Sequence, residues 1–558
     1  MDEPDVVIVG GGSAGAVVAA RLSEDSHRRV LLLEAGQDTP PGAVPSDIAD
    51  TFPGSYANRN YYWPGLSASG VRGAPQRAFT QARVMGGGSS LMGMWALRGL
   101  PGDYDAWAAA GAKGWAFDDV LPYFCRLERD LDIAGNAHGT DGPVPIRRVP
   151  RASWPGFAGA IERAANARGY PSGADLNGDD ADGFYPIPFS QDGNVRASSA
   201  HCYLTPEVRR RPNLVIMPDT RVDAILFEGT RACGVRVLRH GAESRIAARE
   251  VVVCAGAIHS PALLMRSGVG PGEKLRALGL TPLADLPGVG GNLQNHVFIH
   301  IGVTVARGQR QPASLRNYGI AAIRLSSGRS DCPPGDLLVS AIGRVSTGAI
   351  GVRVGLVTAK LYAPHSRGTV ALQSADPAAP PLVEFRLLDD ARDLERMVQA
   401  ANVAGAILCD PGVAEACPEA FMMPPEPPLQ RLNRPGLMGP VMAGLAAVVM
   451  ESPAMLRRAT LRNMFGAERM LDRAKAPTPF STELVRASAT PMFHVAGTCA
   501  MGADDDPAAV VDSHCRVRGV QNLRVIDSSI MPVVPRANTN IPTIMVAERA
   551  VDLMRSHA

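Results

Sequence analysis

The chain has 558 residues, of which 46% are hydrophobic and 20% charged, and its formal net charge is +2. This length is too great for one small core, so we expect a globular protein of two closely packed domains rather than a disordered chain. The nearly balanced charge, with no basic run interleaved with aromatic residues, argues against a nucleic-acid partner.

A glycine-rich loop near the start of the chain is the first functional signal. An apolar run at residues 6–9 leads into it, and a second apolar run at residues 31–33 follows it. Three glycines of the loop have GxGxxG spacing: Gly10, Gly12 and Gly15. In a dinucleotide-binding unit the first glycine permits a tight turn, the second lets the backbone approach a pyrophosphate, and the third lets helix and strand pack closely. An ordinary glycine turn is the alternative, but two strands and a helix in this order favour a dinucleotide site.

Glu34, which ends the second apolar run, narrows the choice of dinucleotide. Its carboxylate would accept hydrogen bonds from a ribose 2′-hydroxyl and would disfavour the additional phosphate of NADP. The fingerprint therefore indicates FAD or NAD and leaves both open.

The chain enters its first predicted strand almost at once, which leaves no room for a secretion signal, so we expect a cytoplasmic protein. The nine cysteines are dispersed, with no CxxC pair and no histidine–cysteine cluster at metal spacing. We therefore expect no zinc or iron–sulfur centre and no other bound metal. No apolar stretch is long enough to span a bilayer.

A second glycine-rich segment, residues 82–99, contains three consecutive glycines followed by Ser89. It resembles the first signature of the glucose-methanol-choline (GMC) oxidoreductases, and residues 256–270 match the second signature of that family. The resemblance continues almost to the end of the chain, at residues 287–294, 366–377, 493–498, 527–532 and 538–542.

The resemblance implies FAD as the cofactor and an α/β fold, with a Rossmann-type FAD-binding domain and a substrate domain made of an antiparallel sheet with flanking helices. We expect the FAD-binding domain to be discontinuous, over residues 1–150, 195–300 and 485–558, and the substrate domain to occupy residues 151–194 and 301–484. The β-branched runs at residues 213–217 and 250–254 are typical of strands and belong with the first domain.

The family pattern also implies which residues contact FAD. By position they are Gly10, Gly12, Ser13, Ala14, Gly15, Glu34, Ala35, Trp63, Arg83, Met85, Gly86, Gly87, Ser89, Met92, Val222, Ala255, Asp527, Ser528, Asn538, Thr539, Asn540, Pro542 and Thr543. Some relatives bind the flavin covalently through a histidine in the second glycine loop, but residue 91 is leucine, so we expect a non-covalent FAD. Met92 stands where asparagine or histidine is common in the family, which removes one polar contact near the flavin.

Oxidation of an alcohol by a flavin requires a base for the hydroxyl proton and a hydrogen-bond donor for the oxygen. The resemblance assigns these roles to His494, at the position of the family's active-site histidine, and to Asn538, at its partner position. Asparagine cannot take a proton, so the base would be His494 alone. The alternative is a buried core histidine and a turn asparagine. His296 resembles a structural element of the flavin domain, and we expect His259 and His300 to be packing residues.

The expected activity is the oxidation of a primary alcohol, aryl or otherwise apolar, to the aldehyde, with O2 as acceptor. The motifs look most like those of bacterial aryl-alcohol and 5-hydroxymethylfurfural oxidases. Three alternatives stay open: a choline-dehydrogenase-like enzyme with a quinone or other non-O2 acceptor, a hydroxynitrile lyase that keeps FAD structurally, and a light-driven fatty-acid decarboxylase.

One apolar run, residues 437–450, precedes the basic stretch 456–465 and has three interpretations. It is a helix pair buried against the core or against a second copy in a homodimer, a surface that lies on a membrane, or a methionine-rich lid over an apolar alcohol. We favour the first, and a homodimer stays open.

Overall fold

The computed structural model describes residues 3–425, 438–466, 469–473 and 480–556. A parallel sheet forms one half of the molecule, in the order β10 (Leu214–Met217), β2 (Val30–Leu33), β1 (Val6–Val9), β14 (Glu250–Val253) and β25 (Leu523–Val525). All residues of β1 and β2 are buried, as expected when helices cover both faces of a parallel sheet. The apolar runs at residues 213–217 and 250–254 form β10 and β14 of this sheet.

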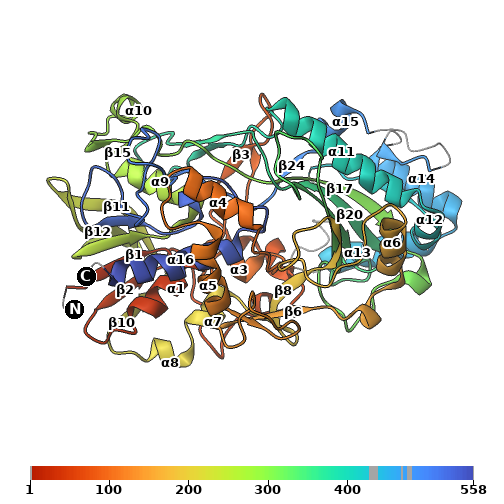
Figure 1. Cartoon of the computed structure of the whole chain (residues 1–558), viewed down its shortest axis with the longest axis horizontal. Coiled ribbons are helices and arrows are strands. Elements are labelled where there is room, and N and C mark those ends of the chain that lie inside the picture. Colours follow the sequence, from red (N-terminus) through yellow and green to blue (C-terminus); the bar gives the residue numbers. More distant parts are fainter. Residues whose placement is uncertain (1–2, 426–437, 467–468, 474–479, 557–558) are drawn as a thin grey trace.

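Three helices begin near the carboxyl ends of these strands. They are α1 (Ser13–Leu22) after β1, α9 (Gly256–Arg266) after β14, and α16 (Asn540–Arg555), which follows β25 after a longer loop. The helices α1 and α16 pack against each other, and both chain ends lie at this end of the molecule (Figure 1). Because the strands are parallel, the N-termini of these helices meet at one edge of the sheet, where α/β proteins bind ligands.

An antiparallel sheet of seven strands forms the other half. Its order is β23 (Ala420–Met422), β17 (Val297–Thr304), β20 (Val354–Leu361), β19 (Leu337–Ile342), β18 (Ala321–Leu325) and β7 (Gly183–Pro186), and β24 (Thr490–Pro491) also pairs with β17. The long helix α11 (Ala391–Leu408) runs along one face (Figure 1). The expected fold class, a Rossmann-type unit with an antiparallel substrate sheet and flanking helices, is confirmed.

Strand β20 shows how the second sheet separates core from site. Val357, Ala359 and Leu361 belong to the same hydrophobic cluster as residues of α11, whereas Leu356, Thr358 and Lys360 turn to the opposite face and line a cavity. This alternation follows from the two-residue period of a strand.

Smaller elements complete the fold. A second glycine loop leads into the short helix α3 (Gly88–Leu91), a ribbon of β11 (Thr220–Glu228), β12 (Arg231–Arg239) and β13 (Ala242–Ala247) lies beside the first sheet, and α6 (Gly156–Asn166) and α12 (Pro411–Ala416) pack together near α11. None of the helices in the described part of the chain combines the length and apolar character that crossing a bilayer requires.

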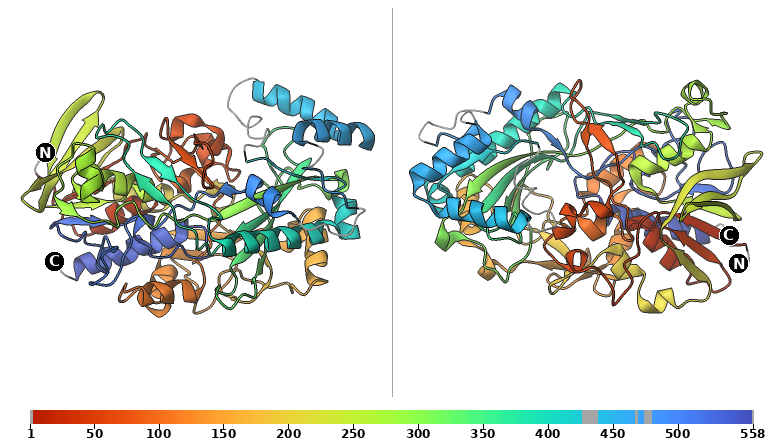
Figure 2. Two further views of the ribbon diagram at one scale, coloured as in Figure 1. Left: turned by 90° about the horizontal axis from the view of Figure 1, so that it is seen from above. Right: turned by 180° about the vertical axis from the view of Figure 1, so that it is seen from behind.

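The apolar run forms α13 (Met438–Glu451), and the basic stretch lies in α14 (Ala454–Phe465); residue 437 lies outside the described residues. Both helices stand at one edge of the substrate sheet in the view from above (Figure 2). Ala443 and Met450 pack into a hydrophobic cluster, whereas Val441 and Leu445 are exposed. The helix pair is therefore buried on one side only.

Candidate active site

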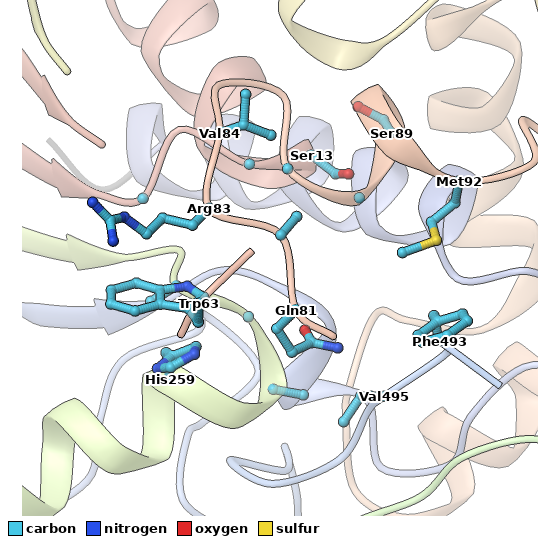
Figure 3. A pocket seen from close by; sticks show the side chains of 18 of the residues that line it. Ser13, Trp63, Gln81, Arg83, Val84, Ser89, Met92, His259, Phe493 and Val495 are labelled. Atoms are coloured by element: carbon cyan, nitrogen blue, oxygen red, sulfur yellow. The ribbon is translucent and has the colours of Figure 1, made fainter. Parts of the chain in front are cut away.

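A cavity of about 680 Å³ lies between the two sheets. Its wall begins at the first glycine loop and Glu34, passes the N-termini of α1 and α16, and ends at Phe298 and Lys360 of the antiparallel sheet. Figure 3 shows part of this wall, with Arg83 and Trp63 on one side and Met92 and Phe493 on the other. One continuous cavity thus joins the first glycine loop to the antiparallel sheet.

The two glycine loops form one cradle. The backbone N–H of Gly86 donates a 2.7 Å hydrogen bond to the carbonyl oxygen of Gly11. A Cβ atom at Gly87 would lie 2.9 Å from the Cα atom of Gly12, so only glycine permits this approach. A Cβ atom at Gly15 would lie 1.8 Å from the carbonyl oxygen of Gly10, which is the close helix–strand packing that the fingerprint predicts.

Glu34 lies at the end of β2 with its carboxylate on the cavity wall. Its two oxygens accept hydrogen bonds of 2.8 Å from the backbone N–H groups of Gly11 and Gly36. Burial raises the pKa of this carboxyl, and the two N–H groups oppose that effect. Each oxygen keeps a second lone pair, so the carboxylate can still accept a ribose hydroxyl.

Aromatic side chains line the wall beyond Glu34. The ring of Trp63 stacks on His259 with 4.3 Å between ring centroids, and the guanidinium of Arg83 lies 5.7 Å from the Trp63 ring centroid (Figure 3). His259 and His300, which we expected to be packing residues, both line the cavity, and their packing role stays a prediction. His259 sits in the first turn of α9, which opens toward the cavity, and His300 is on the cavity face of β17.

The C-terminal segment closes the cavity on the side of the first sheet. Asp527 accepts hydrogen bonds from the Gly256 N–H at 2.8 Å and from the Ser260 hydroxyl at 2.5 Å, and it thereby ties the end of β25 to α9. The Ser13 hydroxyl donates to Asn540 Oδ1 at 2.7 Å, which joins the first turns of α1 and α16. These helix N-termini direct free N–H groups and positive dipole ends toward the cavity, an arrangement suited to phosphates and other anions.

Most of the expected cofactor residues reach the cavity. Those on its wall are Gly10, Gly12, Ser13, Ala14, Glu34, Ala35, Trp63, Arg83, Gly87, Ser89, Met92, Val222, Ala255, Asp527, Ser528, Asn538, Thr539, Asn540 and Thr543. The other four, Gly15, Met85, Gly86 and Pro542, lie behind this wall. The residues present therefore fit an adenine dinucleotide, through a cradle that only glycine allows, a carboxylate for the ribose and helix N-termini for the phosphates.

His494 lies on the wall at the substrate end and is buried. Its Nδ1 atom is 2.8 Å from Nδ1 of His296, which is itself fully buried. Burial lowers the pKa of His494 well below 6.5, and the neighbouring His296 and Lys360 lower it further. His494 is therefore a neutral imidazole with one ring nitrogen engaged and the other, Nε2, left for a ligand.

Asn538 is held in place by the side chain of Tyr362. Its Oδ1 atom accepts a 2.9 Å hydrogen bond from the hydroxyl of Tyr362, and the Tyr362 ring stacks on His296 at 4.4 Å between centroids. Four side chains thus form one connected group. The sequence did not reveal Tyr362, and it assigned His296 only a structural role; the sole signal was the position of His296 in the segment that resembles the family.

The substrate end of the wall is mainly apolar. Its larger apolar and aromatic side chains are Phe52, Met92, Trp95, Phe298, Tyr318, Ile342, Val345, Leu356, Met423 and Phe493. Figure 3 shows Met92 and Phe493 on the same side of the cavity. Among the described residues of α13, none lines the cavity, which opposes a lid role for that part of the helix.

A separate charged cluster surrounds His138, away from the cavity. Glu128, Asp130 and His138 lie close enough together to hold an ion. Carboxylates nevertheless occupy both ring nitrogens, since Nδ1 lies 2.7 Å from Glu128 and Nε2 lies 2.8 Å from Asp175. Hydrogen bonds to Asp130, Asp175 and Glu128 raise the pKa of His138 to about 11. Arg98 and Arg148 also pair with these carboxylates, so the cluster is a buried network of ion pairs.

Comparison with known proteins identifies relatives along the whole chain. Two models described as GMC oxidoreductase match residues 4–298 and 364–547. A 5-(hydroxymethyl)furfural oxidase of Methylovorus sp. (strain MP688) is 38% identical over 99% of both chains. An oxygen-dependent choline dehydrogenase of Vibrio vulnificus (strain YJ016) is 31% identical over 99% of this chain and 94% of that one. Among solved structures, a pyridoxine 4-oxidase from Mesorbium loti has a TM-score of 0.80 at 28% identity, covering 100% of both chains.

Proposed function

Because the chain belongs to the GMC oxidoreductases and is an FAD-dependent alcohol oxidoreductase, we propose that it oxidises a primary alcohol, aryl or otherwise apolar, to the aldehyde with O2 as acceptor. One observation carries the proposal: a buried neutral imidazole, His494, lies on an apolar cavity wall with only Nδ1 engaged by the protein. A 38% identical relative named as an oxidase of a hydroxymethyl compound supports the substrate class.

Two glycine loops, Glu34 and the first turns of α1 and α16 would hold the cofactor. Bound FAD supplies the hydride acceptor of the reaction. The contribution of the chain itself is to bind and orient the alcohol, to exclude water and to move its hydroxyl proton.

His494 takes the hydroxyl proton at Nε2. This role requires the Nδ1 proton of His494 to be donated to Nδ1 of His296, because a neutral imidazole carries one proton only. His296 thereby fixes the tautomer and the ring orientation of the base. Burial keeps the pKa of His494 well below 6.5, so the base is unprotonated at neutral pH.

Asn538 holds the alcohol oxygen. Since the Tyr362 hydroxyl donates to Oδ1 of Asn538, the amide is oriented and its Nδ2 group is left to donate. A hydrogen bond from Nδ2 to the alcohol oxygen would stabilise the negative charge that develops as the proton leaves. Asn538 therefore positions the alcohol oxygen, and His494 removes the hydroxyl proton.

Anaerobic mixing of the holoprotein with benzyl alcohol tests the proposal. We expect the absorbance band of the oxidised flavin to bleach, and we expect His494→Ala with full FAD content to bleach about 10²- to 10⁴-fold more slowly. Repetition in air with measurement of peroxide separates an oxidase from a dehydrogenase. A flavin that stays oxidised in the dark with every aryl alcohol contradicts the proposal and favours a lyase or a photodecarboxylase.

The choline-dehydrogenase alternative is supported by a 31% identical relative, but one residue of the cavity opposes it. Lys360 places an amine on the substrate wall, and its protonated form would repel a quaternary ammonium group. The same anaerobic test with choline in place of benzyl alcohol decides between the two substrates.

A further inference from the structure

Lys360 is the one lysine on the cavity wall within the described residues. It lies on β20, where its register neighbours are Phe298 of β17 and Leu338 of β19. The adjacent residues Ala359 and Leu361 point to the opposite face and pack in the hydrophobic core. An amine therefore occupies a position on the cavity face whose neighbours across the sheet are apolar.

No carboxylate of the described residues lies within ion-pair distance of Lys360, although this residue is only 4% exposed. Its Nζ atom lies 3.7 Å from the centroid of the Trp95 ring, which offers a cation–π contact on one side. Burial lowers the pKa of Lys360 well below 10.5. A buried ammonium without a carboxylate is costly, so a polar or charged partner from outside the chain would stabilise it.

The amine and the proposed base line one cavity. In its charged form the amine lowers the pKa values of His494, His296 and His300. A single ligand in this cavity can therefore contact both Lys360 and His494. One aromatic ring can carry both a hydroxymethyl group, which would face His494, and an acid group, which would face Lys360.

We propose that Lys360 binds a carboxylate of the substrate, so that the alcohols best suited to this site carry an acid group on the same ring as the hydroxymethyl group. This inference rests on the proposed function and adds a substrate class to it. Phe298 and Trp95 would flank the ring of such a compound, and the ammonium would pair with its acid group.

The test compares 3- and 4-(hydroxymethyl)benzoate with their methyl esters, which keep the ring and the hydroxymethyl group but lack the charge. In the wild-type holoenzyme we expect at least one acid to have a higher kcat/KM than its ester. In Lys360→Met, which keeps an unbranched side chain one atom shorter and removes the charge, we expect the acid-to-ester ratio of kcat/KM to fall about 10- to 100-fold. Lys274→Met is the matched control, because Lys274 is exposed and its loss changes the net charge equally; its ratio should equal that of the wild type.

Binding of benzoate to the oxidised holoenzyme, followed through the flavin absorbance spectrum, gives a readout that needs no turnover. We expect Lys360→Met to raise the Kd of benzoate about 10- to 100-fold. An unchanged ratio and an unchanged Kd overturn the inference, and so does an equal loss for acid and ester, which would assign Lys360 to the reaction itself. If the wild type oxidises no alcohol, the proposed function fails, whereas the benzoate titration still decides the role of Lys360.

Discussion

The imidazoles of His296 and His494 meet through their Nδ1 atoms at 2.8 Å, although the two residues are 198 positions apart in the chain. Both rings are buried, and burial lowers both pKa values, that of His296 to about 3. Two neutral rings can share this hydrogen bond only if one Nδ1 donates and the other accepts. The hydrogen bond therefore determines which nitrogen of His494 is free to act on a substrate.

Replacement of His296 should slow the reaction while leaving the cofactor bound. In His296→Leu the Nδ1 proton of His494 loses its acceptor, so the tautomer with a free Nε2 is no longer favoured. We expect the rate of anaerobic flavin bleaching to fall about 10- to 100-fold at unchanged FAD content. His296→Gln retains an acceptor oxygen and should recover part of the rate. Equal rates in the wild type and His296→Leu would show that His296 has only a packing role.

The pH dependence of the reaction should lack an acidic limb near the usual pKa of histidine. Because the pKa of His494 is held well below 6.5, the base stays neutral as the pH falls through 6.5. We expect kcat/KM for benzyl alcohol to be constant from about pH 8 to below pH 6.5. A protonation step centred at or above pH 6.5 would assign the base to another group or place His494 in contact with solvent.

Local patterns and family position predicted part of this site, and tertiary packing decided the rest. The glycine spacing, Glu34 and the runs that form β10 and β14 follow from short segments whose periodicity is visible in the sequence. The positions of His494 and Asn538 came from the family resemblance and not from any local rule.

Lys360 and Tyr362 could not be predicted in the same way. The alternation along β20 places Lys360 on the opposite face from Ala359, but it does not say which face α11 covers. That choice depends on a helix 31 or more residues further along the chain, beginning at Ala391. The Tyr362–Asn538 hydrogen bond likewise joins residues 176 positions apart.

Acid should destabilise the protein before its carboxylates titrate. Burial lowers the pKa values of His259, His296 and His300 to about 3. An unfolded chain takes up these protons near pH 6.5 and the folded protein does not, so stability falls as the pH decreases from 6.5 toward 3. At pH 5 each histidine contributes a loss of about 2 kcal/mol.

Melting temperatures at pH 7.5 and pH 5 measure this loss. His138 provides a contrast because its pKa is raised to about 11, so its stabilising contribution is complete below pH 6.5 and declines as the pH rises from 6.5 to 11. His138→Gln should therefore lower the melting temperature at least as much at pH 5 as at pH 7.5, the opposite of the trend for the neutral histidines. A wild-type melting temperature that does not change between pH 7.5 and pH 5 would contradict the neutral state of the buried histidines.

FAD should be removable without breaking a covalent bond. Leu91 is fully buried in a cluster with Tyr61, Tyr62 and Val84, and it offers no nucleophile to the flavin. We expect acid precipitation to release all of the flavin into the supernatant as intact FAD. Added FAD should then restore the absorbance spectrum of protein stripped by a milder method, such as dialysis against bromide. A yellow pellet after precipitation would indicate a covalent bond at another residue.

The intact protein should not bind anionic vesicles through α13 and α14. Val441, Leu445 and Val448 form an exposed apolar row on α13, but Arg457 and Arg458 of α14 pair with Glu419 at 2.8 and 3.4 Å. Peripheral membrane helices need cations facing the lipid headgroups as well as an apolar face, and here two of the basic side chains are engaged within the fold.

Flotation with phosphatidylserine-containing vesicles tests this expectation, and we expect the protein to stay in the bottom fraction. The matched variant replaces Leu445 and Val448 with serine, which removes apolar area from the exposed row while leaving Arg457 and Glu419 in place. Wild type and variant should behave alike. If the wild type floats and the variant does not, α13 is a membrane-binding surface and the pairing with Glu419 does not prevent it.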